Sequence, residues 1–254
     1  MRAAIIGSGS SGNATLISTD TTTILVDCGL STKAFVERAD ALNFDPASID
    51  AVLVTHEHGD HIGGVGSLAR RFKLDVHATS GTLQSAGNDV FSKVSTHRIS
   101  PHSAFSIGDI DVDPAIVPHD AREPCQFVFR NGTRKMGLLT DLGHGTPFVL
   151  EHYADCDSMI LEFNHDAAML EACQYPSSVK RRVGGPYGHL SNDQAVDILK
   201  RLNGHTPGHV IAAHISDNSN DTAVVGDLLE QAASEHGCRT SIAPQGDVVP
   251  WFEI

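Results

Sequence analysis

The sequence contains no apolar run that is long enough to cross a membrane and no pair of closely spaced cysteines. The apolar segment from Met1 to Gly7 is too short for the core of a signal peptide, so we expect a cytoplasmic protein without a membrane partner. The five cysteines stand singly, which is typical neither of a disulfide framework nor of a zinc ribbon. An odd number of isolated thiols fits a reducing compartment.

Basic residues are also scarce. Lys and Arg together number 18 against 31 Asp and Glu, which gives a formal net charge of −13. A protein that binds long duplexes by neutralising phosphates is usually basic, so this balance argues against a wide nucleic-acid-binding face. It remains compatible with a short strand or a chain end that is bound locally at a metal site. Among the polar residues, the 15 histidines are the most informative.

No linker, short repeat or low-complexity tract divides the chain, and we expect one α/β domain over residues 1–254. Residues 94–140 are expected to be mostly β. Alternation and turn residues predict strands at Arg2–Ile6, Ala14–Ser18, Thr23–Asp27, Ala51–Val54, Ile110–Val117, Gln126–Arg130, Met136–Thr140, Met159–Phe163, Val210–Ala213 and Thr240–Ala243. Helical periodicity predicts helices from a Ser31 cap to about Leu42, from about Ile62 to Phe72, and over Asp193–Leu202 and Thr222–His236.

The N-terminal glycines match a dinucleotide-binding pattern, Gly-x-Gly-x-x-Gly, over Gly7–Gly12, and Asp27 follows at a suitable distance. That fingerprint requires a helix to begin at the glycines, so that its N-terminus meets the pyrophosphate. The residues that follow, Asn13–Asp27, are instead rich in β-branched side chains without helical periodicity. The glycines therefore indicate a tight turn between strands.

The segment Thr55-His56-Glu57-His58-Gly59-Asp60-His61 follows a predicted buried strand. In an extended loop, His56 and His58 point the same way and can bind one cation. We expect Gly59 to let the chain turn, so that Asp60 and His61 face a second cation. Imidazole and carboxylate ligands together suit Zn²⁺, and Mn²⁺ or Fe²⁺ also fit such a site.

This segment resembles the signature of the metallo-β-lactamase superfamily. The resemblance implies a four-layer αββα sandwich with two divalent metal ions at one edge of the sheets. It directs attention to a histidine, an aspartate and a histidine that each follow a predicted strand. The ligand set that it implies is His56, His58 and His119 for one metal and Asp60, His61 and His214 for the other, with Asp141 bridging both.

Between the last two of these ligands lies Gly188-His189-Leu190-Ser191-Asn192, which resembles the RNase Z and cyclic-phosphodiesterase branch. In that branch the histidine contacts the scissile phosphate without binding metal. Further motifs lie at Gly7–Asn13, His119–Ala121, Glu162–Asp166, Tyr175-Pro176, Lys180–Arg182 and Gly188–Asn192. Together they resemble the YycJ (WalJ) group, although the chain departs from that pattern at Phe163 and Ser219. This resemblance implies hydrolysis of phosphodiester bonds, as a 5′-exonuclease on DNA or as a small phosphodiesterase.

The same resemblance suggests roles for residues around the metals. Asp60 would both bind metal and orient the nucleophile, and His189 would act as the general acid. Gly9 and Asn13 are candidates to bind substrate phosphate. So are Lys180, Arg181 and Arg182, for which a solvated helix end is an equally good interpretation. His144 and His165 are candidates to hydrogen-bond a metal ligand, although ordinary surface or core positions would explain them too.

Two other classes of function remain open. One is a metal-dependent thioesterase or lactonase, which would hydrolyse a different bond at the same metals. The other is a non-catalytic regulatory module that keeps the fold. Such a module would be expected to lack some ligands, whereas every position of the set is filled here.

Overall fold

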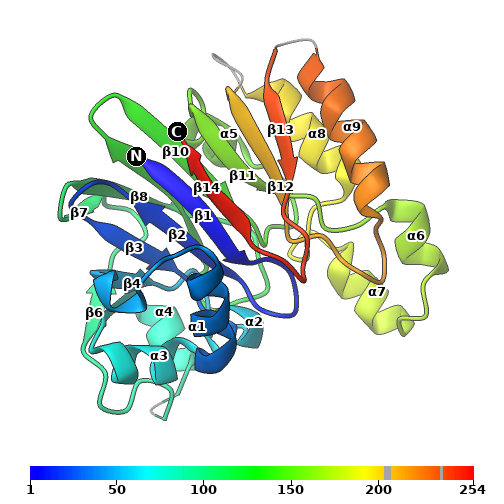
Figure 1. Ribbon diagram of the computed structural model, residues 1–254. Coiled ribbons are helices and arrows are strands. Elements are labelled where there is room, and N and C mark those ends of the chain that lie inside the picture. The colour runs from blue at the N-terminus through cyan, green and yellow to red at the C-terminus, as the bar shows by residue number, and fades with distance from the viewer. Residues whose placement is uncertain (88, 203–206, 235–236) are drawn as a thin grey trace.

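The computed structural model describes residues 1–87, 89–202, 207–234 and 237–254. Two seven-stranded sheets pack face to face within these residues (Figure 1). The first sheet has the strand order β14-β1-β2-β3-β4-β5-β6. Its strands are β1 (Arg2–Gly7), β2 (Ala14–Ser18), β3 (Thr23–Val26), β4 (Ala51–Leu53), β5 (Asp75–Thr79), β6 (Thr96–Ile99) and β14 (Val249–Glu253).

The second sheet has the strand order β13-β12-β11-β10-β9-β8-β7. Its strands are β7 (Phe105–Ile107), β8 (Ile110–Ile116), β9 (Cys125–Asn131), β10 (Arg134–Leu139), β11 (Ser158–Glu162), β12 (His209–Ala213) and β13 (Arg239–Ile242). Both sheets are mixed. In each sheet four strands are parallel to one another, β3 to β6 and β10 to β13, and the other pairs are antiparallel. Parallel strands end at the same edge of a sheet, so the loops after β4, β10 and β12 are brought to such an edge.

Helices cover the outer face of each sheet (Figure 1). The helices are α1 (Thr32–Ala41), α2 (Gly59–Ile62), α3 (Val65–Phe72), α4 (Ser80–Ser85), α5 (Pro147–His152), α6 (Ala167–Ala172), α7 (Ser177–Val183), α8 (Asn192–Arg201) and α9 (Thr222–Ser234), with a 3₁₀ turn at Pro46–Ser48. Figure 1 shows α1, α3 and α4 beside the first sheet and α5, α8 and α9 beside the second. The order of layers is therefore helix, sheet, sheet, helix, as predicted.

Three apolar layers hold this sandwich together. Side chains alternate between the two faces of a strand, so Ala4 and Ile6 of β1 pack against the layer that contains Phe35 of α1. The intervening Ala3 and Ile5 pack into the layer between the two sheets. A third layer lies between the second sheet and its helices and includes Ile198 of α8 and Leu229 of α9. Burial on both faces explains why these strands read as almost continuous apolar runs in the sequence.

The helix predicted over Ile62–Phe72 is two helices, α2 and α3, that are separated by Gly63 and Gly64. At Gly64 an added Cβ would lie 1.8 Å from the Leu30 carbonyl oxygen, so only glycine allows the two segments of chain to approach this closely. The sequence did not predict β5, β14 or helices α4 to α7. These four helices have six or seven residues each, too few for helical periodicity to reveal. Of the helix predicted to end at His236, residues 235–236 lie outside the described part of the chain.

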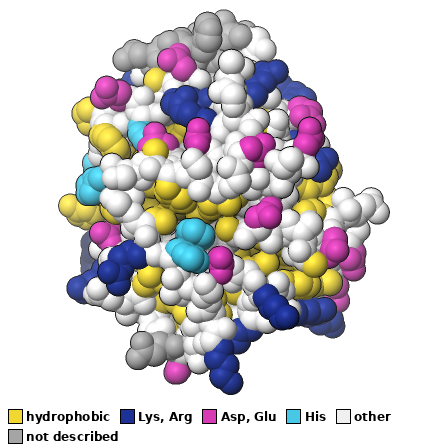
Figure 2. Space-filling view, turned by 90° about the vertical axis from the view of Figure 1, so that its left-hand side faces the viewer, with side chains coloured by type: hydrophobic (Ala, Val, Ile, Leu, Met, Phe, Trp, Pro, Cys, Tyr) yellow, Lys and Arg dark blue, Asp and Glu magenta, His cyan; other side chains and the backbone are white. Residues whose placement is uncertain are grey.

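Figure 2 shows the side of the molecule on which β6 and β7 lie in Figure 1. Hydrophobic side chains form a band across this face, and basic side chains are interspersed with acidic ones above and below it. Among the described residues, no helix is both long enough and apolar enough to span a membrane.

Candidate metal centre and its pocket

The predicted metal ligands come together at one edge of the sandwich because each follows the end of a strand. His56 and His58 lie in the loop after β4, and α2 carries Asp60 and His61. The other three, His119, Asp141 and His214, follow β8, β10 and β12.

The backbone turns sharply at several of these strand ends. Asp27, Asp141 and His214 adopt left-handed conformations, with φ of 58°, 55° and 55°. Non-glycine residues rarely adopt this conformation, and such strain is concentrated at functional sites.

Three histidines form the first group of converging ligand atoms. His58 Nδ1 lies 3.0 Å from Nε2 of His56 and 3.2 Å from Nε2 of His119. His119 Nδ1 donates to the Gly188 carbonyl oxygen at 3.0 Å, which leaves Nε2 of His119 with its lone pair directed at the group. His56 Nδ1 is occupied by the Thr55 hydroxyl at 2.9 Å. Nitrogen lone pairs that converge in this way suit a cation.

The second group combines two carboxylates with two histidines. Asp60 Oδ2 lies 3.5 Å from Nε2 of both His61 and His214. Asp141 contacts the same nitrogens, with Oδ2 at 3.3 Å from His61 and Oδ1 at 3.5 Å from His214. Asp141 also forms a group with His56 and His61 in which the potential ligand atoms lie within 4.8 Å of one another. It is therefore placed to contact ions in both groups.

Two buried atoms in this cluster, Asp141 Oδ2 and His214 Nε2, have no hydrogen-bond partner among the described residues. A buried polar atom without a partner costs about 1–3 kcal/mol. A bound cation would satisfy both atoms, so the residues present fit a metal centre.

Electrostatics supports the same conclusion. Burial alone would raise the pKa of Asp141, but the charges of His214 and His61 outweigh it and hold that pKa well below its usual range. Burial would likewise lower the pKa of His214, yet Asp141, Asp60 and Glu162 raise it to about 10. The carboxylates are thus ionised and attract positive charge, which the protonated His214 ring supplies here and which divalent cations could supply in its place.

Two buried carboxylates that the sequence reasoning missed orient the histidines. Asp27, directly after β3, accepts a hydrogen bond from His61 Nδ1 at 2.8 Å and another from the Thr55 backbone N–H at 2.9 Å. Glu162, at the end of β11, lies with Oε1 at 2.9 Å from Nδ1 of both His189 and His214. Carboxylates behind ligating histidines fix the tautomer and raise the basicity of the ligand. Their position at strand ends was a signal in the sequence, and Glu162 also stands in one of the segments that carry the family resemblance.

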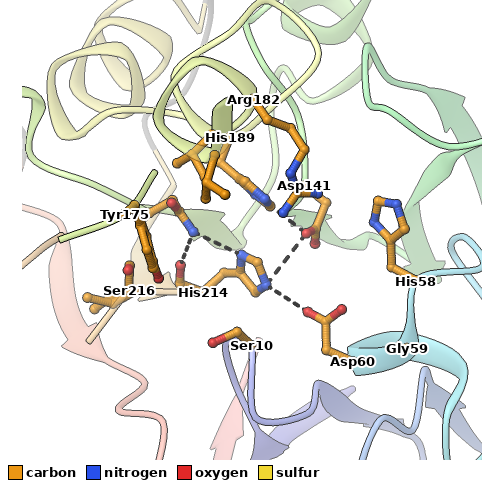
Figure 3. Close-up of a pocket in the computed structure, with 14 residues that line it drawn as sticks. Ser10, His58, Gly59, Asp60, Asp141, Tyr175, Arg182, His189, His214 and Ser216 are labelled. Carbon is orange, nitrogen blue, oxygen red and sulfur yellow. Dashed lines mark hydrogen bonds and ion pairs between the residues drawn. The ribbon is translucent and has the colours of Figure 1, made fainter. Parts of the chain in front are cut away.

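The cluster opens into a pocket of about 510 Å³. His58 lies toward one end of this pocket, Tyr175 and Ser216 lie toward the other, and Asp60, Asp141 and His214 lie between them (Figure 3). The lining residues are Ser10, His58, Gly59, Asp60, Asp141, Asn164, Tyr175, Val179, Arg182, Val183, His189, His214, Ile215 and Ser216.

The glycine-rich turn lies beside the metal ligands. Asn13 Nδ2 lies 3.3 Å from Asp60 Oδ2 and 3.0 Å from His61 Nε2. The Gly9 N–H donates to Asn13 Oδ1 at 2.8 Å, so that amide holds Asn13 in place and is not available to a phosphate. The pocket is lined by Ser10 of this turn, and this corrects the expectation for Gly9.

The basic run on α7 also needs correction. The Lys180 ammonium group donates to the Glu171 carbonyl oxygen, and Arg181 is exposed outside the pocket lining. Arg182 is the residue of the run that lines the pocket, and its Nη1 lies 3.4 Å from Asp120 Oδ2. A helix directs consecutive side chains about 100° apart, so only part of a basic run can face one site.

His144 and His165 do not hydrogen-bond a metal ligand in the part of the chain that is described. His144 is exposed, and its Nδ1 lies 3.0 Å from the Pro186 carbonyl oxygen. His165 is buried, and its Nδ1 has no partner among the described residues. Asp27 and Glu162, and not these two histidines, hydrogen-bond the proposed metal ligands His61 and His214.

Comparison with known proteins identifies the family of the chain. The family model described as "Beta-lactamase superfamily domain" matches residues 22–215. The chain therefore belongs to the metallo-β-lactamase superfamily. Zn²⁺-bound PqqB from Methylobacterium extorquens superposes with a TM-score of 0.73 at 17% identity, over 98% of this chain and 99% of that one, so the two share the fold.

Two relatives of higher sequence identity place the chain more narrowly within this superfamily. Exodeoxyribonuclease YycJ of Bacillus anthracis is 33% identical over 236 residues, which cover 92% of this chain and 89% of that protein. Exodeoxyribonuclease WalJ of Streptococcus pneumoniae is 34% identical over 220 residues, which cover 85% of this chain and 82% of the relative. The resemblance to the YycJ (WalJ) group is confirmed.

Proposed function

We propose that this protein is a dinuclear metal-dependent phosphodiesterase, and specifically a nuclease that acts at the ends of DNA strands. The observation that carries the proposal is the convergence of two ligand groups on Asp141, beside a histidine, His189, that the ligand set does not need. The names of the relatives YycJ and WalJ support DNA as the substrate.

His56, His58 and His119 would hold one metal ion, and Asp60, His61 and His214 the other, with Asp141 contacting both. Two divalent ions would act as Lewis acids that polarise the phosphate and lower the pKa of a coordinated water. The imidazole and carboxylate donors favour Zn²⁺, with Mn²⁺ or Fe²⁺ as alternatives to be distinguished by analysis.

The protein's own groups would position and protonate the substrate. Burial would raise the pKa of Asp60, but the adjacent His214 and His61 rings outweigh it and hold that pKa well below its usual range, so Asp60 can accept a hydrogen bond from the attacking water. His189 lines the pocket, and Glu162 holds its Nδ1 at 2.9 Å. Its Nε2 is then the atom that can give a proton to the leaving oxygen.

Charge favours local binding of a strand end. The chain carries 18 basic against 31 acidic residues, and Arg182 is the only Lys or Arg among the described residues that line the pocket. We infer that residues 1–254 act as one domain in the cytoplasm, and the unpaired state of all five cysteines supports a reducing compartment.

The test combines metal analysis with a substrate panel. Elemental analysis of the purified protein should give two divalent ions per chain, and a chelator should abolish activity until metal is returned. Single- and double-stranded DNA labelled at either end should be shortened from the 5′ end, faster than RNA of the same sequence. Hydrolysis of thioesters or lactones without cleavage of any phosphodiester would overturn the proposal, as would a protein that binds no metal and cleaves nothing.

A further inference from the structure

Part of the pocket lining is apolar, although the metal ligands and Ser216 make the rest of it polar. Tyr175 precedes α7, Val179 and Val183 lie on it, and Ile215 lines the same pocket from the loop after β12. Val179 and Val183 lie on one side of the helix, since residues four apart in a helix are neighbours, and Tyr175 lines the pocket just before the helix begins. An apolar wall that is continuous with the metal centre is unnecessary for holding a phosphate alone.

The wall lies where the rest of a nucleotide would extend. Figure 3 shows Tyr175 at the opposite end of the pocket from His58, with Asp141 and His214 between them. The cavity volume of about 510 Å³ lies in the range of about 300–1,000 Å³ that is typical of sites for small organic ligands. There is thus room for one nucleoside beyond the phosphate, and the wall offers it an aromatic ring.

The Tyr175 side chain is also available for a ligand. It is partly exposed, and its hydroxyl has no hydrogen-bond partner within the described ranges. The ring is therefore not tied into the fold by its polar atom. Arg182 of α7 also lines the pocket and adds positive charge near Asp141 and His189 (Figure 3).

We propose that Tyr175, with Val179, Val183 and Ile215, forms a subsite that stacks the base of the nucleotide whose phosphodiester lies at the metal ligands. The inference rests on the proposed nuclease function and deepens it. Every base has a π-face, so this subsite would select nucleotides over other phosphodiesters without selecting a sequence.

The experiment compares two phosphodiesters with the same leaving group. Thymidine 5′-(p-nitrophenyl phosphate) carries a base, and methyl p-nitrophenyl phosphate does not. Tyr175→Ala should lower kcat/KM for the thymidine ester about 5- to 150-fold, the loss expected for one stacked base, and leave the methyl ester within about twofold. Tyr175→Phe should keep both activities because stacking does not need the hydroxyl. Tyr187→Ala is the matched control, since Tyr187 is 61% exposed and lies outside the pocket lining.

A binding measurement makes the test independent of turnover. In calorimetry, thymidine monophosphate should bind the wild type more tightly than inorganic phosphate does, and Tyr175→Ala should remove that difference. A parallel loss on both esters would show a structural role for Tyr175 and overturn the subsite. Equal kcat/KM of the wild type on the two esters would also overturn it, while leaving the phosphodiesterase function intact. A wild type that cleaves neither ester would refute the proposed function and this inference with it.

Discussion

His189 donates its Nδ1–H to Oε1 of Glu162 across 2.9 Å, and Glu162 is completely buried. Burial would raise the pKa of Glu162, but the charge of His189 outweighs it and lowers that pKa to about 2, so the carboxylate is the acceptor. The same oxygen accepts a hydrogen bond from Nδ1 of His214 at 2.9 Å. One carboxylate therefore orients both a proposed metal ligand and the proposed general acid.

The first prediction concerns His189 itself. His189→Ala should keep both metal ions and the fold, because the ligand set is complete without this residue. Phosphodiesterase kcat should fall about 10²- to 10⁴-fold, the usual contribution of a general acid. Metal content and kcat are to be measured on the same preparation. A variant that loses a metal ion would identify His189 as a ligand, and near-normal turnover on every phosphodiester would exclude it as the acid.

The second prediction concerns its partner. Glu162→Gln keeps the shape of the side chain but removes the charge that holds the Nδ1–H of both histidines. We expect metal affinity or kcat/KM to fall about 10- to 100-fold, as is usual when such a partner is replaced. Glu151→Gln, an exposed substitution on α5, is the control and should change neither. Unchanged metal affinity and unchanged turnover in Glu162→Gln would show that the two hydrogen bonds do not orient the site.

The third prediction tests the bridging position. Asp141→Asn should lower occupancy of both metal positions, because Asp141 contacts the nitrogens of both His61 and His214 and also forms a group with His56. His58→Ala should lower occupancy of one position only, since His58 belongs to the three-histidine group. Elemental analysis after limited exposure to chelator distinguishes the two patterns. Loss of a single ion from both variants would argue against a bridge.

The two kinds of functional residue differ in how far the sequence could predict them. His56 to His61 form a compact motif, and the family resemblance of that motif pointed to the remaining ligands, each of which follows a predicted strand and so could be expected at one edge. Asp27 and Glu162 are also at strand ends, but a single buried carboxylate has no spacing pattern that separates it from any other. Only the three-dimensional distances to His61, His189 and His214 identify their role.

The basic run on α7 shows a different limit. The sequence gives three consecutive cations but not the rotation of a helix of seven residues. Packing of Val183 against the fold sets that rotation, and it directs Arg182 to the pocket while Lys180 bonds to a backbone carbonyl. The position of Tyr175 in the pocket was likewise not predictable, because it depends on which residues line the cavity with it.

The fourth prediction concerns stability against pH, away from the metal centre. Burial, together with the charge of Arg239, lowers the pKa of His209 from 6.5 to about 4. Arg239 Nη2 donates to His209 Nδ1 at 2.9 Å, so the folded state requires the neutral ring. The unfolded chain binds this proton below pH of about 6.5, and the folded protein resists binding it until about 4. Stability from this group is therefore present above that window and is lost as pH falls through it.

The measurement is urea unfolding at pH 7 and pH 5. The wild type should lose about 1 kcal/mol more than His209→Gln between the two pH values, after allowance for solvent screening. His102→Gln replaces an exposed histidine and should behave like the wild type. An equal loss in wild type and His209→Gln would show that the buried ring does not contribute.

The last prediction separates two glycines near the metal loop. At Gly29 an added Cβ would lie 1.9 Å from the backbone carbonyl oxygen of Asp60, so Gly29→Ala must displace that ligand. Gly59 stands inside the histidine motif, yet its φ is outside the left-handed region and no atom lies within 4 Å of its added Cβ. The expectation that the chain needs glycine there in order to turn is therefore corrected, because Gly59 is simply the first residue of α2.

Gly29→Ala should accordingly lower metal occupancy and destabilise the fold by about 1–3 kcal/mol, the usual cost of forcing an extra methyl group into a packed region. Gly59→Ala should keep both metal ions and the wild-type unfolding midpoint, because alanine is accommodated without a clash and favours helix. Elemental analysis and thermal unfolding of the two variants, prepared side by side, give the comparison. The opposite result, in which Gly59→Ala loses metal and Gly29→Ala keeps it, would contradict this prediction. It would show that Asp60 is positioned by the backbone freedom of Gly59 and not by the close approach of Gly29.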